Sequence, residues 1–93
     1  MPSSEEFISY CKEWIANYFN DHCEKTDKVD ITPNDVYVVW YCKTLQNHKG
    51  LFSTNIPDGM YYEATFNGDR SQIYFDAYKK WQNVAVNCFG ENA

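Results

Sequence analysis

Apolar residues recur at helical spacing near the start of the chain. Between residues 7 and 22 they follow the i, i+3, i+4, i+7 pattern of an amphipathic helix, which collects on one stripe Phe7, Ile8, Cys11, Trp14, Ile15, Tyr18 and Phe19. Ser3 and Glu6 have the spacing of an N-terminal capping box. The pattern therefore predicts a helix over about residues 4–24, followed by a polar, turn-rich connection over residues 25–35.

Residues 36–80 carry the signals of β-structure. A β-branched and aromatic run from Val36 to about Leu45 predicts the first strand. We expect a turn at residues 47–50, a second strand over 51–56, a reversal at 57–59 and a third strand over 60–66. The dipeptide Asn67-Gly68 predicts a two-residue type I′ hairpin that leads into a fourth strand ending near Lys80. The expected fold is α+β, a single domain over residues 1–93 in which the helix packs on a four-stranded antiparallel meander.

The predicted hairpin also fixes a register and two faces. With a two-residue loop, Tyr61 lies opposite Tyr74 and Tyr62 lies opposite Ile73. One face of this hairpin is then apolar and should lie under the helix: Met60, Tyr62, Ala64, Ile73, Phe75 and Ala77.

The C-terminal stretch allows a second interpretation. Apolar residues from Ala77 to Cys88 also recur at helical spacing, with Asp76 as an N-cap and Gly90 as a stop. The alternative fold is therefore α-β-β-β-α with a C-terminal helix, although the alternation of residues 73–78 favours a strand.

Composition and charge exclude several classes of function. The chain has 93 residues and a net charge of −5. Residues 1–35 hold eight acidic and three basic side chains, and Arg70 is the only arginine, so binding of duplex nucleic acid is disfavoured. We find no apolar run of the roughly 18–20 residues that cross a membrane, and no signal-peptide pattern. We therefore expect a cytoplasmic protein with free thiols.

Groups that could carry out catalysis are scarce. His22 is expected at the helix end and His48 in an exposed turn, and neither lies in a nucleophile motif. A dyad of His48 with Cys42 can be drawn, but an exposed turn histidine is the simpler interpretation. No phosphate-binding glycine loop and no paired zinc-ligand spacing is present. The sequence therefore predicts no enzymatic activity, no cofactor and no metal.

Tyrosine is the unusual residue, with eight in the chain. We expect the sheet face away from the helix to gather Tyr61, Tyr74 and Tyr78, joined by Tyr37 and Tyr41 if the register of the first strand allows. Such a face fits a protein interface, a homodimer contact, a stacking platform for single-stranded nucleic acid, or ordinary cross-strand pairs. Glu63 and Asp76 lie among the tyrosines, which favours a protein partner.

An acidic surface is the second candidate interface. It combines side chains of the helix and the connection that follows it: Glu5, Glu6, Glu13, Asp21, Glu24, Asp27 and Asp30. Acidic residues at this density keep a small domain soluble or attract a basic partner.

Four stretches of the chain resemble a family of small uncharacterised proteins encoded by phages and prophages of Gram-positive bacteria. They are residues 16–22, 35–47, 58–63 and 73–81, and the resemblance covers most of residues 10–86. It implies a phage setting in a bacterial cytoplasm and assigns no catalytic or binding residue. Small acidic phage proteins of this kind often act by binding a host or defence protein. The expected function is protein binding, with an anti-CRISPR or anti-restriction inhibitor that mimics nucleic acid, or a single-stranded nucleic-acid binder, as alternatives.

Overall fold

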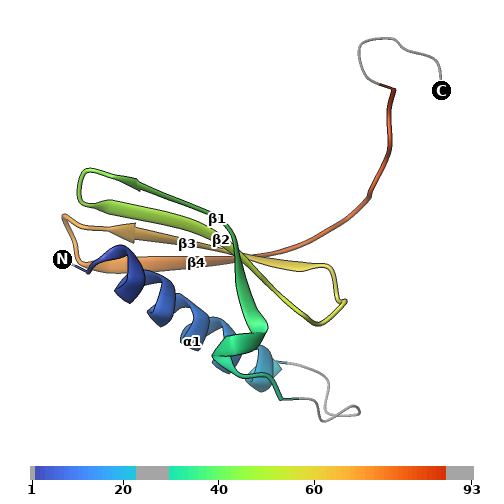
Figure 1. The fold of residues 1–93 in the computed structure, drawn as a ribbon, viewed down its shortest axis with the longest axis horizontal. Coiled ribbons are helices and arrows are strands. Elements are labelled where there is room, and N and C mark those ends of the chain that lie inside the picture. The colour runs from blue at the N-terminus through green and yellow to red at the C-terminus, as the bar shows by residue number, and fades with distance from the viewer. Residues whose placement is uncertain (1, 23–29, 88–93) are drawn as a thin grey trace.

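The fold is one helix on one face of a four-stranded sheet (Figure 1). The computed structural model describes residues 2–22 and 30–87. Helix α1 spans Ser4–His22, and a short 3-10 turn, η1, spans Pro33–Asp35. The strands are β1 (Val36–Thr44), β2 (Asn47–Thr54), β3 (Met60–Asn67) and β4 (Gln72–Lys79). They pair antiparallel in the order β1-β2-β3-β4. The α+β fold expected from the sequence is confirmed.

Helix α1 begins where the capping box predicted. The Ser3 backbone N–H donates to Glu6 Oε1, and the Glu6 backbone N–H donates to Ser3 Oγ, both at 3.1 Å. The apolar stripe of the helix then enters the core, with Phe7, Cys11 and Ile15 buried. Ala16, which lies beside this stripe, is buried as well.

The core lies between α1 and the sheet face that the hairpin pattern predicted. Tyr62 and Ala64 of β3 are buried there, while Met60, Ile73 and Phe75 are half-buried against them. The Trp14 ring stacks on Phe75 with ring centroids 3.8 Å apart. The predicted division of β3 and β4 into a covered and an open face is therefore confirmed, although Ala77, near the end of β4, remains exposed.

The first hairpin differs from the prediction. Its turn is Leu45-Gln46, with Leu45 at φ 55°, so Asn47–Gly50 are strand residues rather than a turn. Gly50 has a packing role there, because a Cβ at this position would lie 2.9 Å from Cε1 of the buried Phe52 ring. The predicted turn was wrong because polar residues and glycine resembled a loop.

A β-bulge in β1 changes which residues face the helix. Val38 pairs with Phe52 and Trp40 pairs with Leu51, so Val39 is an extra residue. Beyond the bulge the alternation is reversed. Tyr41 therefore turns toward α1, and Trp40 turns away from it.

The hairpin between β3 and β4 has a longer loop than predicted. Asn67 pairs with Gln72, which leaves residues 68–71 in the loop. The Asp69 backbone N–H donates to Asn67 Oδ1 at 3.0 Å, and Ser71 adopts φ 51°. Tyr61 consequently pairs with Tyr78 instead of Tyr74. The predicted register was wrong by four residues, but an even shift keeps every side chain on its predicted face.

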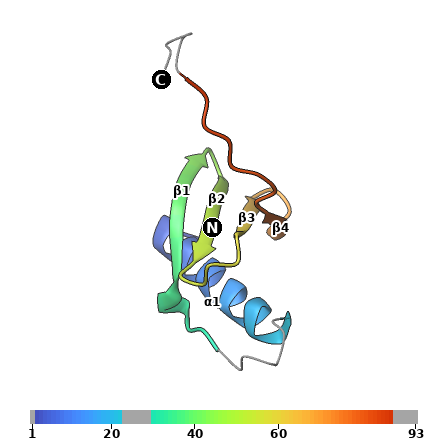
Figure 2. The ribbon, with the colours of Figure 1, turned by 90° about the vertical axis from the view of Figure 1, so that its right-hand side faces the viewer.

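The segment after β4 is extended and not helical. Residues 80–87 have no regular secondary structure and leave the sheet on the side opposite to α1 (Figures 1 and 2). The alternative fold with a C-terminal helix is therefore not adopted over the described residues.

Candidate functional site: the outer face of the sheet

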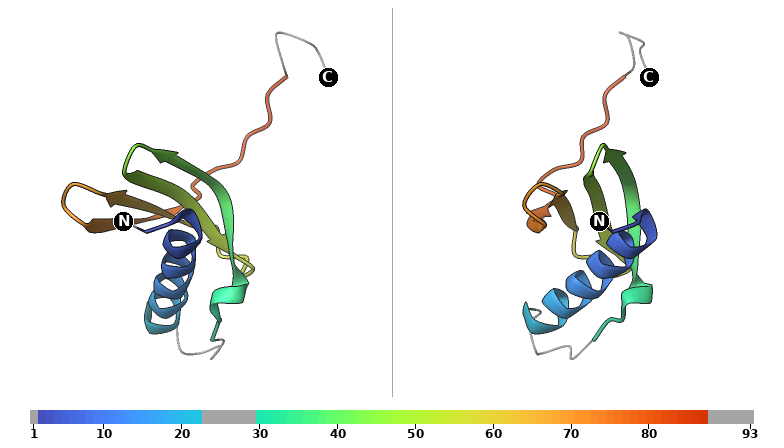
Figure 3. Two further views of the ribbon diagram at one scale, coloured as in Figure 1. Left: turned by 60° about the vertical axis from the view of Figure 1, so that its left-hand side comes forward. Right: turned by 90° about the vertical axis from the view of Figure 1, so that its left-hand side faces the viewer.

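One face of the sheet carries no helix or strand within the described part of the chain. Figure 3 shows α1 beneath the sheet and the opposite side open. We call this surface the outer face. Its side chains come from all four strands: Tyr37, Trp40, Cys42, Lys49, Leu51, Tyr61, Glu63, Thr65, Tyr74, Asp76 and Tyr78.

Aromatic rings are spread across this face. Tyr61 pairs directly with Tyr78 on the neighbouring strand. Tyr37 is 47% exposed and Tyr78 is 52% exposed, and Trp40 and Tyr74 are similarly accessible. Amphipathic rings on an open sheet face can bury large area against a partner at a small entropic cost.

Of the five predicted interface tyrosines, Tyr41 does not belong to this face. It is half-buried on the α1 side, where its ring lies 5.8 Å from the Phe7 ring and its hydroxyl donates to Ser4 Oγ at 2.9 Å. The β1 bulge accounts for the difference. Trp40, which the sequence analysis did not select, takes its place on the outer face.

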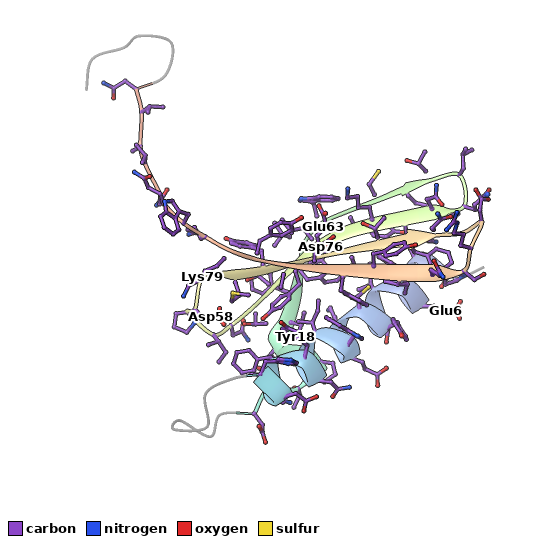
Figure 4. The ribbon with its side chains drawn as sticks, turned by 180° about the vertical axis from the view of Figure 1, so that it is seen from behind. Glu6, Tyr18, Asp58, Glu63, Asp76 and Lys79 are labelled. Carbon is purple, nitrogen blue, oxygen red and sulfur yellow. The ribbon has the colours of Figure 1, made fainter. Side chains whose placement is uncertain are left out.

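The polar groups of the outer face carry both signs of charge. Lys49 Nζ lies 3.8 Å from Glu63 Oε2, and Glu63 pairs with Asp76 on β4. Both carboxylates point to the side away from α1 (Figure 4). The negative charges of Asp76 and then Glu63 raise the pKa of the Tyr78 hydroxyl. The β3–β4 half of the face is therefore electrostatically negative.

A shallow pocket lies at one end of the face, where β1, β2 and β3 meet. Its volume is about 430 Å³, and its lining includes Trp40, Cys42, Lys49 and Thr65. The Cys42 thiol is free and exposed. This pocket extends the outer face with a concave, mostly apolar end.

The acidic surface predicted from the sequence is only partly described. Glu5, Glu13 and Asp21 are exposed on α1, and Asp30 is exposed beyond it, whereas Glu24 and Asp27 lie outside the described residues. Glu6 belongs to the capping box, and the hydrogen bonds from Ser3 lower the pKa of its carboxyl.

His48 is the residue that the sequence analysis misplaced most. It lies in β2, is 1% exposed and stacks on the Phe7 ring with centroids 5.0 Å apart. The Tyr41 hydroxyl forms hydrogen bonds with both Ser4 Oγ and His48 Nδ1. His48 Nε2 has no hydrogen-bond partner among the described residues.

This environment keeps the imidazole neutral. Burial lowers the pKa of His48 below its ordinary value of 6.5, and the charge of Lys43 lowers it further, against a raising contribution from the Pro2 carbonyl. Cys42 pairs with Lys49 and so lies on the outer face, opposite to His48. The His48–Cys42 dyad considered from the sequence is not assembled. The other described thiol, Cys11, has its pKa raised to about 12 by burial.

The described residues contain neither a metal-ligand cluster nor a membrane-spanning helix. No group of three His, Cys, Asp or Glu side chains could hold a metal ion there. No helix in that part of the chain combines the length and the apolar character needed to cross a membrane.

Comparisons with known proteins identify a family whose function is unknown. Neither the curated proteins nor the solved structures include a match to this chain. A family model matches residues 8–88, a range that contains most of α1 and all four strands. The chain belongs to this family, which is described as a family of unknown function, DUF6275.

Proposed function

We propose that this chain is a non-enzymatic binding protein whose outer face contacts another protein. The observation that carries the proposal is the row of exposed rings on a sheet face that no described helix or strand covers, from Tyr37 and Trp40 on β1 to Tyr74 and Tyr78 on β4. Exposed apolar patches of this kind are typical of interaction sites. Aromatic rings are also enriched in the centres of protein interfaces.

The charges of the face favour a protein over single-stranded nucleic acid. A stacking platform for bases is normally lined by cations that follow the phosphates. Here Lys49 is engaged with Glu63, and Asp76 lies between Tyr74 and Tyr78. These carboxylates would repel a phosphate backbone, whereas a protein partner can supply complementary charges.

The acidic surface of α1 is a weaker candidate for mimicry of nucleic acid. Glu5, Glu13 and Asp21 are spaced at intervals of eight residues, about 12 Å along a helix axis. Phosphates of one DNA strand follow one another every 3.4 Å or so along the axis. The carboxylates are therefore sparser along the axis than the phosphates that they would mimic. For this reason an anti-CRISPR or anti-restriction role through this surface is only the second form of the proposal.

The setting of the proposal is a phage or prophage protein of Gram-positive bacteria that acts in the host cytoplasm on a host or defence factor. This setting comes from the sequence resemblance. Self-association through the outer face is a further form of the same proposal, because a two-fold dimer can bury such a face.

Affinity capture from host lysate with variants of both surfaces tests the proposal. In the outer-face variant, Tyr37→Ser and Trp40→Ser remove two exposed rings of β1. In the matched control, Glu5→Gln and Glu13→Gln remove two charges of α1. We expect quantitative mass spectrometry to find a partner that the wild type and the control retain and that the outer-face variant loses at least tenfold, about 1.4 kcal/mol of binding free energy.

Two outcomes would contradict the proposal. Loss of the partner from the control alone would assign binding to the acidic surface. Salt-sensitive binding of a fluorescent single-stranded oligonucleotide, lost in the outer-face variant, would assign the face to nucleic acid. Circular dichroism of each variant establishes that the fold is retained.

A further inference from the structure

The segment that follows β4 is extended, uncharged after its first residue, and paired with no strand among the described residues. We call residues 80–87 the C-terminal arm. The Lys80 backbone N–H donates to the Gly59 carbonyl at 2.8 Å. Beyond this bond, residues 81–87 form no hydrogen bond with the described part of the chain. Trp81, Val84 and Val86 are 95%, 61% and 80% exposed.

The sequence of the arm suits a β-strand. Residues 80–87 contain no glycine or proline, and β-branched valines stand at alternate positions 84 and 86. Three exposed apolar side chains on an arm of eight residues are costly in water unless something covers them. The arm therefore has both the backbone groups and the side chains of a strand that lacks a neighbour.

The sheet offers a matching acceptor at its β4 edge. In the order β1-β2-β3-β4, the outer edges of β1 and β4 are both unpaired within the described residues. The β1 edge is interrupted by the bulge at Val39, a feature that blunts strand edges against pairing. No register shift interrupts the pairing of β3 with β4 over Gln72–Lys79, and β4 has eight residues, the same length as the arm.

The arm cannot fill this edge in its own chain without reversing direction. It continues directly from β4, and its base is held by the hydrogen bond to Gly59. Figures 1 and 2 show it leading away from the sheet on the side opposite to α1. Residues 80–83 contain neither glycine nor proline, and a turn at Asn83 would leave only residues 84–87 to pair along β4.

We propose that the C-terminal arm pairs antiparallel with the β4 edge of a second copy of this chain, which returns its own arm in the same way. Each copy has an uninterrupted β4 edge and an arm of equal length, so a two-fold dimer satisfies both at once. Antiparallel edge pairing about such an axis presents the outer faces of both copies on the same side. The dimer therefore leaves the surface assigned to partner binding accessible.

The test compares the full chain with two arm variants. Val84→Pro with Val86→Pro removes backbone donors and prevents ladder pairing, whereas Val84→Ile with Val86→Ile keeps the β-branched character as a matched control. Residues 81–87 make no hydrogen bond with the described part of their own chain, so both variants should retain the fold by circular dichroism. Sedimentation equilibrium should give twice 11.0 kDa for the wild type and the isoleucine variant. The dimer dissociation constant of the proline variant should rise about tenfold or more, the effect of losing at least one strong contact.

Hydrogen exchange then locates the contact. Amides of β4 that do not bond to β3 should be protected from exchange in the wild type and should lose this protection in the proline variant. Exchange of the β1 amides should stay unchanged. A monomeric wild type at high concentration, a dimer that survives both prolines, or protection at β1 instead of β4 would each overturn the inference. The outer-face variant with Tyr37→Ser and Trp40→Ser should still dimerise. Failure of the arm contact is thus distinguishable from failure of the proposed partner binding.

Discussion

At the scale of single residues, His48 shows how a buried polar side chain is missed by sequence patterns. It stands between Asn47 and Lys49, both polar and exposed, so the segment resembled a turn. Its inward neighbour at alternate spacing is Gly50, which adds no apolar signal. What places His48 in the core is the ring of Phe7 and the hydroxyl of Tyr41, contacts that lie far apart in sequence.

The burial of His48 predicts a pH dependence of stability. Because the folded state has a lowered His48 pKa, the unfolded chain binds more protons than the folded chain below about pH 6.5. The free energy of unfolding should therefore fall as pH decreases from 6.5, by at most about 1.4 kcal/mol per pH unit from this group. Urea denaturation at a series of pH values measures this slope, and NMR titration of the His48 ring protons assigns it. A His48 that titrates at or above 6.5 would contradict the account.

The hydroxyl groups of Tyr41 and Tyr37, both in β1, should contribute unequally to the free energy of unfolding. Tyr41→Phe leaves the buried His48 Nδ1 without its hydrogen-bond partner, so it should lower the free energy of unfolding by about 1–3 kcal/mol. Tyr37→Phe, on the exposed side, is the matched control and should change it by less than about 0.5 kcal/mol. Chemical denaturation of both variants measures these two changes. Equal changes would contradict the prediction, because they would mean that the two side chains lie in similar environments.

At the scale of elements, the sequence predicted those whose periodicity was uninterrupted. The stripe on α1 and the alternation along β3 and β4 identified both covered faces correctly, because burial imposes these periods. The bulge at Val39 was not predictable, since Val38-Val39-Trp40 is apolar throughout and carries no mark of an extra residue. The four-residue loop after Asn67 was missed because the dipeptide Asn67-Gly68 is also the strongest signal for a shorter turn.

A glycine substitution in the loop between β3 and β4 should stabilise or destabilise the fold depending on the register of that hairpin. Ser71 has φ 51°, a conformation that glycine adopts more readily than serine. Ser71→Gly should therefore raise the free energy of unfolding by about 0.5–1 kcal/mol. With the two-residue turn expected from the sequence, Ser71 would instead lie within the fourth strand. Glycine at that position would then lower the free energy of unfolding by a similar amount. Urea denaturation shows whether Ser71→Gly raises or lowers the free energy of unfolding. Gln72→Gly, at the start of β4, is the destabilising control.

At the scale of the whole molecule, the central feature is a sheet covered on one face. The sequence predicted the open face and all four of its tyrosines, and it wrongly added Tyr41 as a fifth. Alternation along β3 and β4 determines the positions of Tyr61, Tyr74 and Tyr78. The sequence did not predict that Trp40 lies on that face, because the position of Trp40 depends on the bulge at Val39. It also did not predict the arm, because strand and helix patterns competed over residues 77–88. Pairing with β3 decides for a strand as far as Lys79.

Site-specific photocrosslinking tests the claim that the outer face is the binding surface most directly. A photoreactive phenylalanine analogue replaces Tyr37 on the outer face or, as the control, Ser9 on the exposed side of α1. After irradiation in host lysate, the analogue at position 37 should give a discrete covalent adduct with one partner protein, and the analogue at position 9 should give none. Adducts from position 9 alone would contradict the account.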